Sequence, residues 1–251
     1  MNNELLKLTA HQVKEREFKK AILAIGSCEA HGYHLAEGTD TLVSYMLSCK
    51  IAEHFDDMVV LPPVTVGYSA HYDDFPLSLT LQYDTVTQVI YDILDSCLRN
   101  GLERIFIMNG HDGNIAPIEI ACRKIKEKYR NAKMAALPQW WVTAGEVLPS
   151  DTFEVWNGLG HAGEGESSIA YYLFPQWNQP EYAKGFVPDR LPEHVDVKWD
   201  FSELTSTGAT GDPTKATPEK GKMMADAIET VCVKAIAQLD QMDWNYNTSN
   251  I

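Results

Sequence analysis

Residues 21–27 read Ala-Ile-Leu-Ala-Ile-Gly-Ser, and this stretch decides the fold class. Five consecutive apolar residues that end at Gly26 and Ser27 are typical of a short strand buried on both faces. Short apolar runs of this kind alternate along the chain with amphipathic segments, which is the pattern of a mostly parallel sheet with crossover helices. The runs predict strands over residues 20–26, 58–61, 104–108 and 133–137.

Apolar residues at helical spacing predict four helices. They begin after Thr39-Asp40, behind the cap candidate Asp84, near Ile115 and near Met223. Residues 176–216 are rich in Pro, Gly, Asp and Thr and have little periodicity, so we expect surface loops or an oligomer contact there. The sequence therefore predicts a single α/β domain over residues 1–251, with a mostly parallel sheet flanked by helices.

Composition limits the class of protein. The chain has 251 residues, of which 45% are hydrophobic and 22% charged, as in a globular protein with a sizeable core. A net charge of −14 disfavours nucleic acid or an anionic membrane surface as a partner. Five cysteines without Cys-x-x-Cys pairing indicate buried free thiols in a reducing compartment. Because no signal-peptide segment or bilayer-length apolar run is present, we expect a cytoplasmic protein.

Polar residues that suit a metal site follow the first predicted strand. Glu29 and His31 are two residues apart, so in an extended segment their side chains point to the same side. Asp40 stands where the next predicted helix begins. A carboxylate, an imidazole and a second carboxylate at the end of a strand are typical of a metal site.

Two further clusters have the same character. Residues 109–114 read Asn-Gly-His-Asp-Gly-Asn and follow the third predicted strand. Residues 160–166 read Gly-His-Ala-Gly-Glu-Gly-Glu and lead into a helix. Ligands of open α/β sheets bind outside the carboxyl ends of the strands, so we expect the polar clusters to converge on one pocket.

This combination fits hydrolytic metal chemistry, although each residue also has a simpler interpretation. A hydrolytic centre needs neutral His nitrogens and carboxylate oxygens that leave a coordination position open for water. Taken alone, Asp40 is equally well a helix cap, whereas Glu29 alone is more simply a surface charge and His31 alone a hydrogen-bonded loop histidine. Glu164 alone is a first-turn charge favoured by the helix dipole. Their coincidence at strand ends and helix starts favours the metal centre.

At these residues the chain resembles the creatininase (creatinine amidohydrolase) family. The motif Gly-Ser-x-Glu-x-His-Gly-x-His-Leu-x-x-Gly-Thr-Asp matches residues 26–40, Asn-Gly-His-x-x-Asn matches residues 109–114, and His-Ala-Gly-x-x-Glu matches residues 161–166. Residues 67–76, which contain Gly-x-Ser-x-His and end in Phe-Pro, and the turn at residues 210–213 are also similar to family segments. The resemblance implies a three-layer αβα fold and a homohexamer.

The resemblance also implies two divalent metal ions, zinc or manganese with iron as an alternative. Glu29, Asp40 and His111 would hold the first ion, and Asp40 would bridge to a second ion held by His31. In creatininase a glutamate two residues after the Asn-Gly-His histidine completes the second site, but here that position is Gly113.

Two residues of the third cluster take the remaining roles. Glu166 is expected to replace the missing glutamate as a metal ligand and to act in catalysis. His161 is expected to be the proton shuttle, because the pKa of an imidazole lies near the operating pH. Glu164 is a weaker candidate for the same pocket.

The expected reaction is attack by metal-bound hydroxide on the carbonyl of a small cyclic amide, a formamide or a lactone. Substrate contacts are expected from Tyr68, His71, Asp112, Trp141 and Trp156, although tryptophans are also common in cores and subunit contacts. The alternatives are creatinine amidohydrolase proper, which Gly113 disfavours, and a non-catalytic relative that binds a small ligand. A Rossmann-type nucleotide site is disfavoured because no Gly-x-Gly-x-x-Gly follows a strand.

Overall fold

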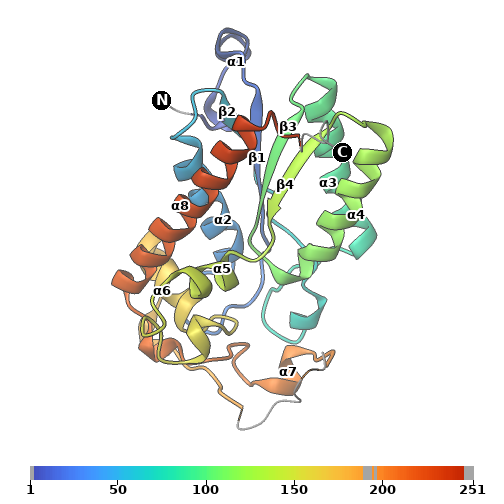
Figure 1. Ribbon diagram of the computed structural model, residues 1–251. Coiled ribbons are helices and arrows are strands. Elements are labelled where there is room, and N and C mark those ends of the chain that lie inside the picture. Colours follow the sequence, from blue (N-terminus) through green and yellow to red (C-terminus); the bar gives the residue numbers. More distant parts are fainter. Residues whose placement is uncertain (1–2, 189–193, 195–196, 246–251) are drawn as a thin grey trace.

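A four-stranded parallel sheet lies at the centre of the computed structural model, which describes residues 3–188, 194 and 197–245 (Figure 1). The strands are β1 (Lys20–Ile25), β2 (Met58–Val60), β3 (Arg104–Asn109) and β4 (Lys133–Leu137). Their order across the sheet is β2-β1-β3-β4. All four strands lie where the apolar runs predict them.

Helices cover both faces of the sheet (Figure 1). One face carries α3 (Tyr83–Arg99) and α4 (Ile115–Lys128), and the other carries α2 (Thr39–Ala52) and α8 (Pro218–Gln241), with α5 (Trp140–Val147) and α6 (Glu164–Leu173) packed on α8. Two short helices, α1 (Ala10–Arg16) and α7 (Phe201–Leu204), lie at opposite ends of the molecule. The predicted αβα fold is therefore confirmed.

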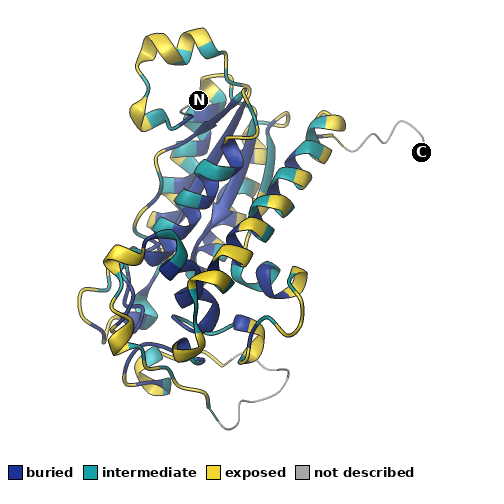
Figure 2. Cartoon of the chain, turned by 90° about the vertical axis from the view of Figure 1, so that its left-hand side faces the viewer, coloured by how far each residue is buried: buried dark blue, intermediate teal, exposed yellow. Residues whose placement is uncertain are grey.

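Alternate residues of β1 face opposite helical layers. Leu23 and Ile25 belong to the core shared with α3 and α4, whereas Ile22 belongs to the core shared with α2 and α8. All six residues of β1 are buried, and Figure 2 shows the buried sheet between helices whose outer faces are exposed. Burying each Leu or Ile contributes about 1.5–3 kcal/mol, which explains why both faces of this strand are apolar.

Two helix starts differ from the simplest sequence prediction. The N-cap of α2 is Gly38, so Asp40 lies in the first turn and its carboxylate does not cap the helix. The N-cap of α3 is Gln82, so the prediction of Asp84 as the cap is wrong. Asp84 lies in the first turn, where the helix dipole also favours a negative charge.

The described part of residues 176–216 consists of loops and short helical turns, as predicted. Residues 189–193 and 195–196 of this segment lie outside the described residues. The oligomer contact expected here stays a prediction. Within the part of the chain that the structure describes, no helix is long and apolar enough to cross a bilayer.

The strand order determines where the site forms. β1 and β3 are neighbours in parallel register, and the last residue of each, Ile25 and Asn109, lie opposite one another. The segments that follow these strands therefore start side by side at the carboxyl edge of the sheet, where ligands of such sheets bind.

Candidate metal centre

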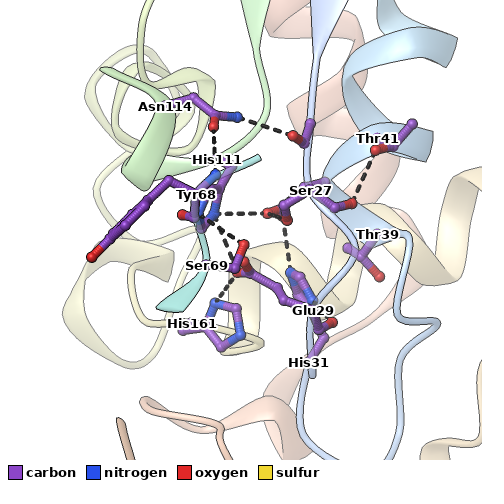
Figure 3. A network of polar contacts seen from close by, with 12 residues as sticks. Ser27, Glu29, His31, Thr39, Thr41, Tyr68, Ser69, His111, Asn114 and His161 are labelled. Atoms are coloured by element: carbon purple, nitrogen blue, oxygen red, sulfur yellow. Dashed lines mark hydrogen bonds and ion pairs between the residues drawn. The ribbon is translucent and has the colours of Figure 1, made fainter. Parts of the chain in front are cut away.

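Two buried carboxylates form the middle of the site. One oxygen of Asp40, Oδ1, lies 2.9 Å from Nε2 of His31, and the other, Oδ2, lies 3.0 Å from Nδ1 of His111. Ser27 donates its hydroxyl hydrogen to the same Oδ2 at 2.6 Å. Glu29 Oε1 lies 3.2 Å from Nδ1 of His111, and Figure 3 shows how these side chains gather. The structure thus brings together residues from two segments that follow neighbouring strands.

Glu29 is the most unusual group of the site. Its side chain is fully buried, and both carboxylate oxygens lack a hydrogen-bond partner among the described residues. A buried carboxylate costs several kcal/mol unless positive charge lies beside it, so Glu29 depends on His111, whose Nδ1 lies 3.2 Å from Oε1, or on a bound cation.

Three histidines are each held by a backbone carbonyl through one ring nitrogen. The carbonyl oxygen of Glu29 lies 3.0 Å from Nδ1 of His31. The carbonyl oxygens of Tyr68 and Ala30 lie 2.7 Å from Nε2 of His111 and of His161, respectively. Because a carbonyl only accepts, we assign the proton to these nitrogens. The opposite nitrogens then face the carboxylates, which is how metal-binding histidines are oriented.

These ligand atoms form two groups. Glu29, Asp40 and His111 form one group, and Glu29, His31 and His161 form the other, with the ligand atoms of each group within 4.8 Å of one another. The first group has the same members as the first predicted metal site.

Glu166 belongs to neither group of the described residues. Its Oε2 accepts a hydrogen bond from the backbone of Ala162 at 2.6 Å and lies 3.9 Å from Nδ1 of His161. Glu166 therefore borders the centre beside His161.

The electrostatics of the metal-free chain also point to a cation. Burial opposes ionisation of Asp40, but the charge of His31 and the hydrogen bond from His111 hold its pKa well below the usual range. Burial opposes protonation of His31, but the charge and hydrogen bond of Asp40 raise its pKa to about 10. The pKa of His111 is raised well above its ordinary value against burial by the charge of Glu29 and the hydrogen bond to Asp40. The two carboxylates thus draw positive charge into the centre.

The pKa values of His161 and Glu166 shift in the directions opposite to those of His31 and Asp40. Burial and the charge of His31 lower the pKa of His161 to about 3, so this ring is neutral at pH 7. Burial raises the pKa of Glu166 to about 7 although the charge of His31 opposes the rise. The donor set of imidazole nitrogens and carboxylate oxygens suits a divalent transition metal.

The backbone around Gly113 leaves no room for a side chain. A Cβ atom there would lie 2.2 Å from the carbonyl oxygen of Tyr68 and 2.6 Å from Nε2 of His111. These are the two atoms of the hydrogen bond that orients His111. A glutamate at this position is thus incompatible with the observed backbone.

A cavity of about 320 Å³ opens beside the centre. Among the residues predicted to contact substrate, His71, Asp112 and Trp141 line it together with the predicted site residues Asp40, His111, His161 and Glu166. A larger cavity of about 730 Å³ between α1 and α3 is mainly apolar and lies away from the histidines.

Two other residues predicted to contact substrate are not among those lining the cavity. The ring of Tyr68 stacks on Tyr83 with ring centroids 3.6 Å apart, so its backbone carbonyl is the part that serves the site. Trp156 lies in a neighbouring loop and is 38% exposed. Glu164 points away from the cavity, and its carboxylate accepts hydrogen bonds from the backbone of residues 154 and 155.

Two aromatic residues of the cavity were missed by the sequence analysis. The ring of Phe201 from α7 lies 4.3 Å from that of Tyr72 and 5.3 Å from that of His161. Tyr72 follows His71 in the segment at residues 67–76 that resembles the family, so its place in the cavity could have been predicted from the sequence. Phe201 lies in the segment without periodicity and carried none.

The fold and the site together define an α/β protein with a histidine–carboxylate centre of the kind found in metallohydrolases. The family profile described as creatinine amidohydrolase matches residues 6–236, so the chain belongs to the creatininase family, a family of hydrolases.

Individual relatives are distant but cover most of the chain. A creatinine amidohydrolase from Pseudomonas putida is 25% identical over 230 residues, which are 86% of this chain and 86% of the relative. A mycofactocin precursor peptide peptidase from Mycobacterium tuberculosis is 24% identical over 232 residues, 86% of this chain and 84% of the relative. Relatives of similar identity thus act on different substrates.

Solved structures share the fold. A structure described as creatininase Mn has a TM-score of 0.83 at 22% identity and covers 95% of this chain and 98% of that one. A mutant creatininase described as Zn-Zn type has a TM-score of 0.82 at 23% identity with the same coverage. Both names refer to a metal in those proteins.

Proposed function

We propose that this chain is a metal-dependent amidohydrolase that cleaves a small cyclic amide or formamide, or the related C–O bond of a lactone. One observation carries the proposal. Two buried histidines, His31 and His111, and the partly buried His161 are held by backbone carbonyls so that the opposite ring nitrogens face carboxylates, and the oxygens of Glu29 among them make no hydrogen bond within the described residues.

The residues present fit two divalent ions. Glu29, Asp40 and His111 would hold one ion, and Asp40 would also contact a second ion held by His31, with Glu166 as the additional ligand that Gly113 cannot supply. When bound, such ions polarise a carbonyl and lower the pKa of water to near neutrality. Zinc and manganese both suit these ligands, and iron is an alternative.

His161 has the position of a proton shuttle and is neutral at pH 7. Burial and the charge of His31 lower the pKa of its ring to about 3 in the metal-free chain, below the near-neutral value expected from the sequence. Its Nε2 hydrogen is donated to the carbonyl of Ala30, which leaves Nδ1 as a proton acceptor at the cavity. Nδ1 lies 3.9 Å from Glu29 Oε1 and 3.9 Å from Glu166 Oε2, so it faces both the centre and the cavity wall. It would take a proton from the attacking water and deliver it to the leaving nitrogen or oxygen.

The cavity favours a small, flat substrate. Its volume of about 320 Å³ is at the lower end of the range for ligand pockets. Tyr72, Trp141 and Phe201 supply aromatic walls on which a planar amide or ring can stack, and His71 and Asp112 supply polar groups at the rim. Tyr68 and Trp156 stay predictions as substrate contacts.

Creatinine itself is the less favoured substrate within this proposal. The family resemblance gives creatininase a glutamate at the position of Gly113, and the backbone here excludes any side chain at that position. Site chemistry decides function within a shared fold, so a different second-site ligand favours a different amide.

The test is a metal and substrate analysis of the purified protein. Metal content is measured by mass spectrometry before and after chelation, and zinc- and manganese-loaded protein is then screened against cyclic amides, formamides and lactones by product mass. We expect about two equivalents of metal per chain and turnover that is lost on chelation and restored by metal. His111→Ala should lose both metal and turnover, whereas the control His54→Gln removes a half-exposed histidine that pairs with Glu229 and should retain both.

Three results would count against the proposal. Full activity in the stripped protein would exclude metal catalysis, and absence of metal after growth in metal-rich medium would exclude the centre. Bound metal without turnover of any amide, formamide or lactone would favour the non-catalytic small-ligand-binding relative. Light scattering would test the homo-oligomer, a hexamer by resemblance, that the proposal includes.

A further inference from the structure

We propose that Glu164 and Lys220 form a positioning pair that holds the loop carrying His161, and that neither residue is a metal ligand or catalytic residue. The inference rests on the proposed function for the role of His161. The contacts of the pair stand independently of that role.

The contacts of Glu164 lie away from the centre. Its side chain is fully buried, and Oε2 accepts hydrogen bonds from the backbone N–H of Glu154 at 2.9 Å and of Val155 at 3.0 Å. Lys220 donates from Nζ to Oε1 at 2.5 Å. A buried carboxylate is costly unless it is paired and hydrogen-bonded, and here the backbone partners lie at the base of one loop while the charged partner, Lys220, lies on α8.

Residues 154–163 form a loop whose two ends both lie beside the carboxylate of Glu164. The loop starts at the two amides that Glu164 binds and ends directly before Glu164, as in a compact Ω-loop whose ends are close together. Trp156, Asn157 and Ala162 have φ values of 47°, 55° and 49°, in the left-handed region that residues with a Cβ adopt at a cost. The loop thus depends on contacts from outside it.

Other parts of the chain supply further contacts of this kind. Asn157 donates from Nδ2 to the carbonyl of Gly145 at 2.8 Å, and the backbone N–H of His161 donates to Thr210 Oγ1 at 2.9 Å. Glu164 holds the base of the loop in the same way. Because the loop also carries Leu159, Gly160 and His161 to the cavity, its position determines where Nδ1 of His161 lies.

Lys220 connects the loop base to the long C-terminal helix. It lies in the first turn of α8, which packs along α6 (Figure 1), and Nζ also donates to the carbonyl of Lys215 at 3.0 Å. Its Nζ lies 3.6 Å from Oε1 of Glu154 as well, so one ammonium group contacts both ends of the loop base.

Glu164 and Glu166 therefore have separate tasks on the same helix turn. Residues two apart on a helix do not face the same side, so Glu166 reaches the cavity while Glu164 reaches the loop base. A displacement of a catalytic group by about 1 Å can cost on the order of 100-fold in rate, so a pair that never touches substrate can still control turnover.

Hydrogen exchange of the zinc-loaded full chain tests the pair. In Glu164→Gln the amides of residues 154–163 should exchange about 10- to 100-fold faster. The amides of residues 154 and 155 lose their hydrogen bonds to a charged group, and the rest of the loop becomes less ordered because its base is no longer held. Bound metal and exchange elsewhere should stay at the wild-type level. On the substrate found by the screen, kcat should fall by about 100-fold with KM nearly unchanged.

Matched variants separate the pair from general effects. Lys220→Met should reproduce the faster exchange, and the double variant should lose no more turnover than Glu164→Gln alone, because the two side chains act as one unit. Lys222→Met removes an exposed lysine of the same helix that pairs with Asp226, and it should leave both readouts unchanged.

The exchange and metal measurements decide the inference even if no substrate is found. Unchanged exchange over residues 154–163 in Glu164→Gln would overturn it, and so would loss of bound metal, which would place Glu164 in the centre. If Glu164→Gln does not fold, Lys220→Met gives the same decision by the same exchange measurement. Failure of the proposed function alone would show as absent turnover in the wild type with the exchange result intact.

Discussion

The carbonyl oxygen of Tyr68 and Nε2 of His111 are 2.7 Å apart, and this hydrogen bond determines which nitrogen of His111 faces Glu29 and Asp40. The backbone of Tyr68 is itself held, through its N–H, by Asn114, which is fully buried. Asn114 accepts from the backbone N–H of Tyr68 at 3.2 Å and donates to the carbonyl of Gly26 at 3.0 Å. One amide side chain thus connects the segments after β1 and β3 with the segment at residues 67–69 (Figure 3).

Replacing Asn114 should therefore weaken metal binding without removing a ligand. We expect Asn114→Leu to lower metal affinity by about 10- to 100-fold, the usual effect of losing a group that orients a metal-binding histidine. Competition with a chromophoric chelator measures the change. Asn100→Asp, at an exposed helix end, is the control, and equal affinity in Asn114→Leu and wild type would contradict the expectation.

Adding a side chain at Gly113 should damage the centre instead of completing it. The new Cβ of Gly113→Ala would enter the space of the Tyr68 carbonyl and His111 Nε2, so we expect a loss of about 1–3 kcal/mol in the free energy of unfolding from overpacking. Gly113→Glu should be at least as damaging. Chemical denaturation measures the loss, and a Gly113→Glu variant with more bound metal than wild type would refute this view.

The metal-free protein should lose stability as pH rises above 6.5. The pKa of His31 is about 10 in the folded chain and near 6.5 when unfolded, so the folded state binds the proton more tightly. The resulting stabilisation is fully present below pH 6.5 and is lost as pH rises toward 10. Thermal unfolding in chelator should show this decline, and His31→Gln should flatten it. Metal-loaded protein should decline less because its ligand histidines are already deprotonated.

The cysteines should react slowly with thiol reagents in the native protein. Burial raises the pKa of Cys97 and Cys122 to about 11 and that of Cys232 to about 12, and it also raises the pKa of Cys28 and Cys49. Little thiolate is present at pH 8, and the thiolate is the reactive form. Alkylation at pH 8 followed by mass spectrometry should show slow labelling until denaturant is added. Fast native labelling of Cys97 or Cys232 would contradict the structure.

Local patterns are sufficient to predict the fold. The strands are continuous apolar runs because both faces of this sheet are covered, and Ile22 and Leu23 need opposite helical layers to be buried at all. The meeting of the segments after β1 and β3 follows from the general rule that polar residues at the carboxyl ends of neighbouring parallel strands converge. Asp40 illustrates the remaining ambiguity, because a helix cap and a site carboxylate look the same until its partners are known.

The rest of the site depends on contacts between distant segments. Glu164 and Glu166 stand in one motif and have the same chemistry, and only the return of the loop to Glu164 separates their tasks. Tyr68 orients His111 through its backbone carbonyl, which every residue type provides, so the sequence carries no signal for this role. Phe201 reaches the cavity from a segment whose composition contains no signal of its position.

The long helix α8 has a consequence for how the protein is made. The proposed metal ligands and His161 all lie before residue 167, whereas α8, which covers α6 and holds the buried Lys20 through Asp240 at 2.6 Å, comes at residues 218–241. A chain grows from its N-terminus on the ribosome. A nascent chain thus displays the whole set of histidines and carboxylates while α6 and Lys20 are still uncovered. The packing of α8 on α6 and Lys20 therefore follows the synthesis of every proposed ligand.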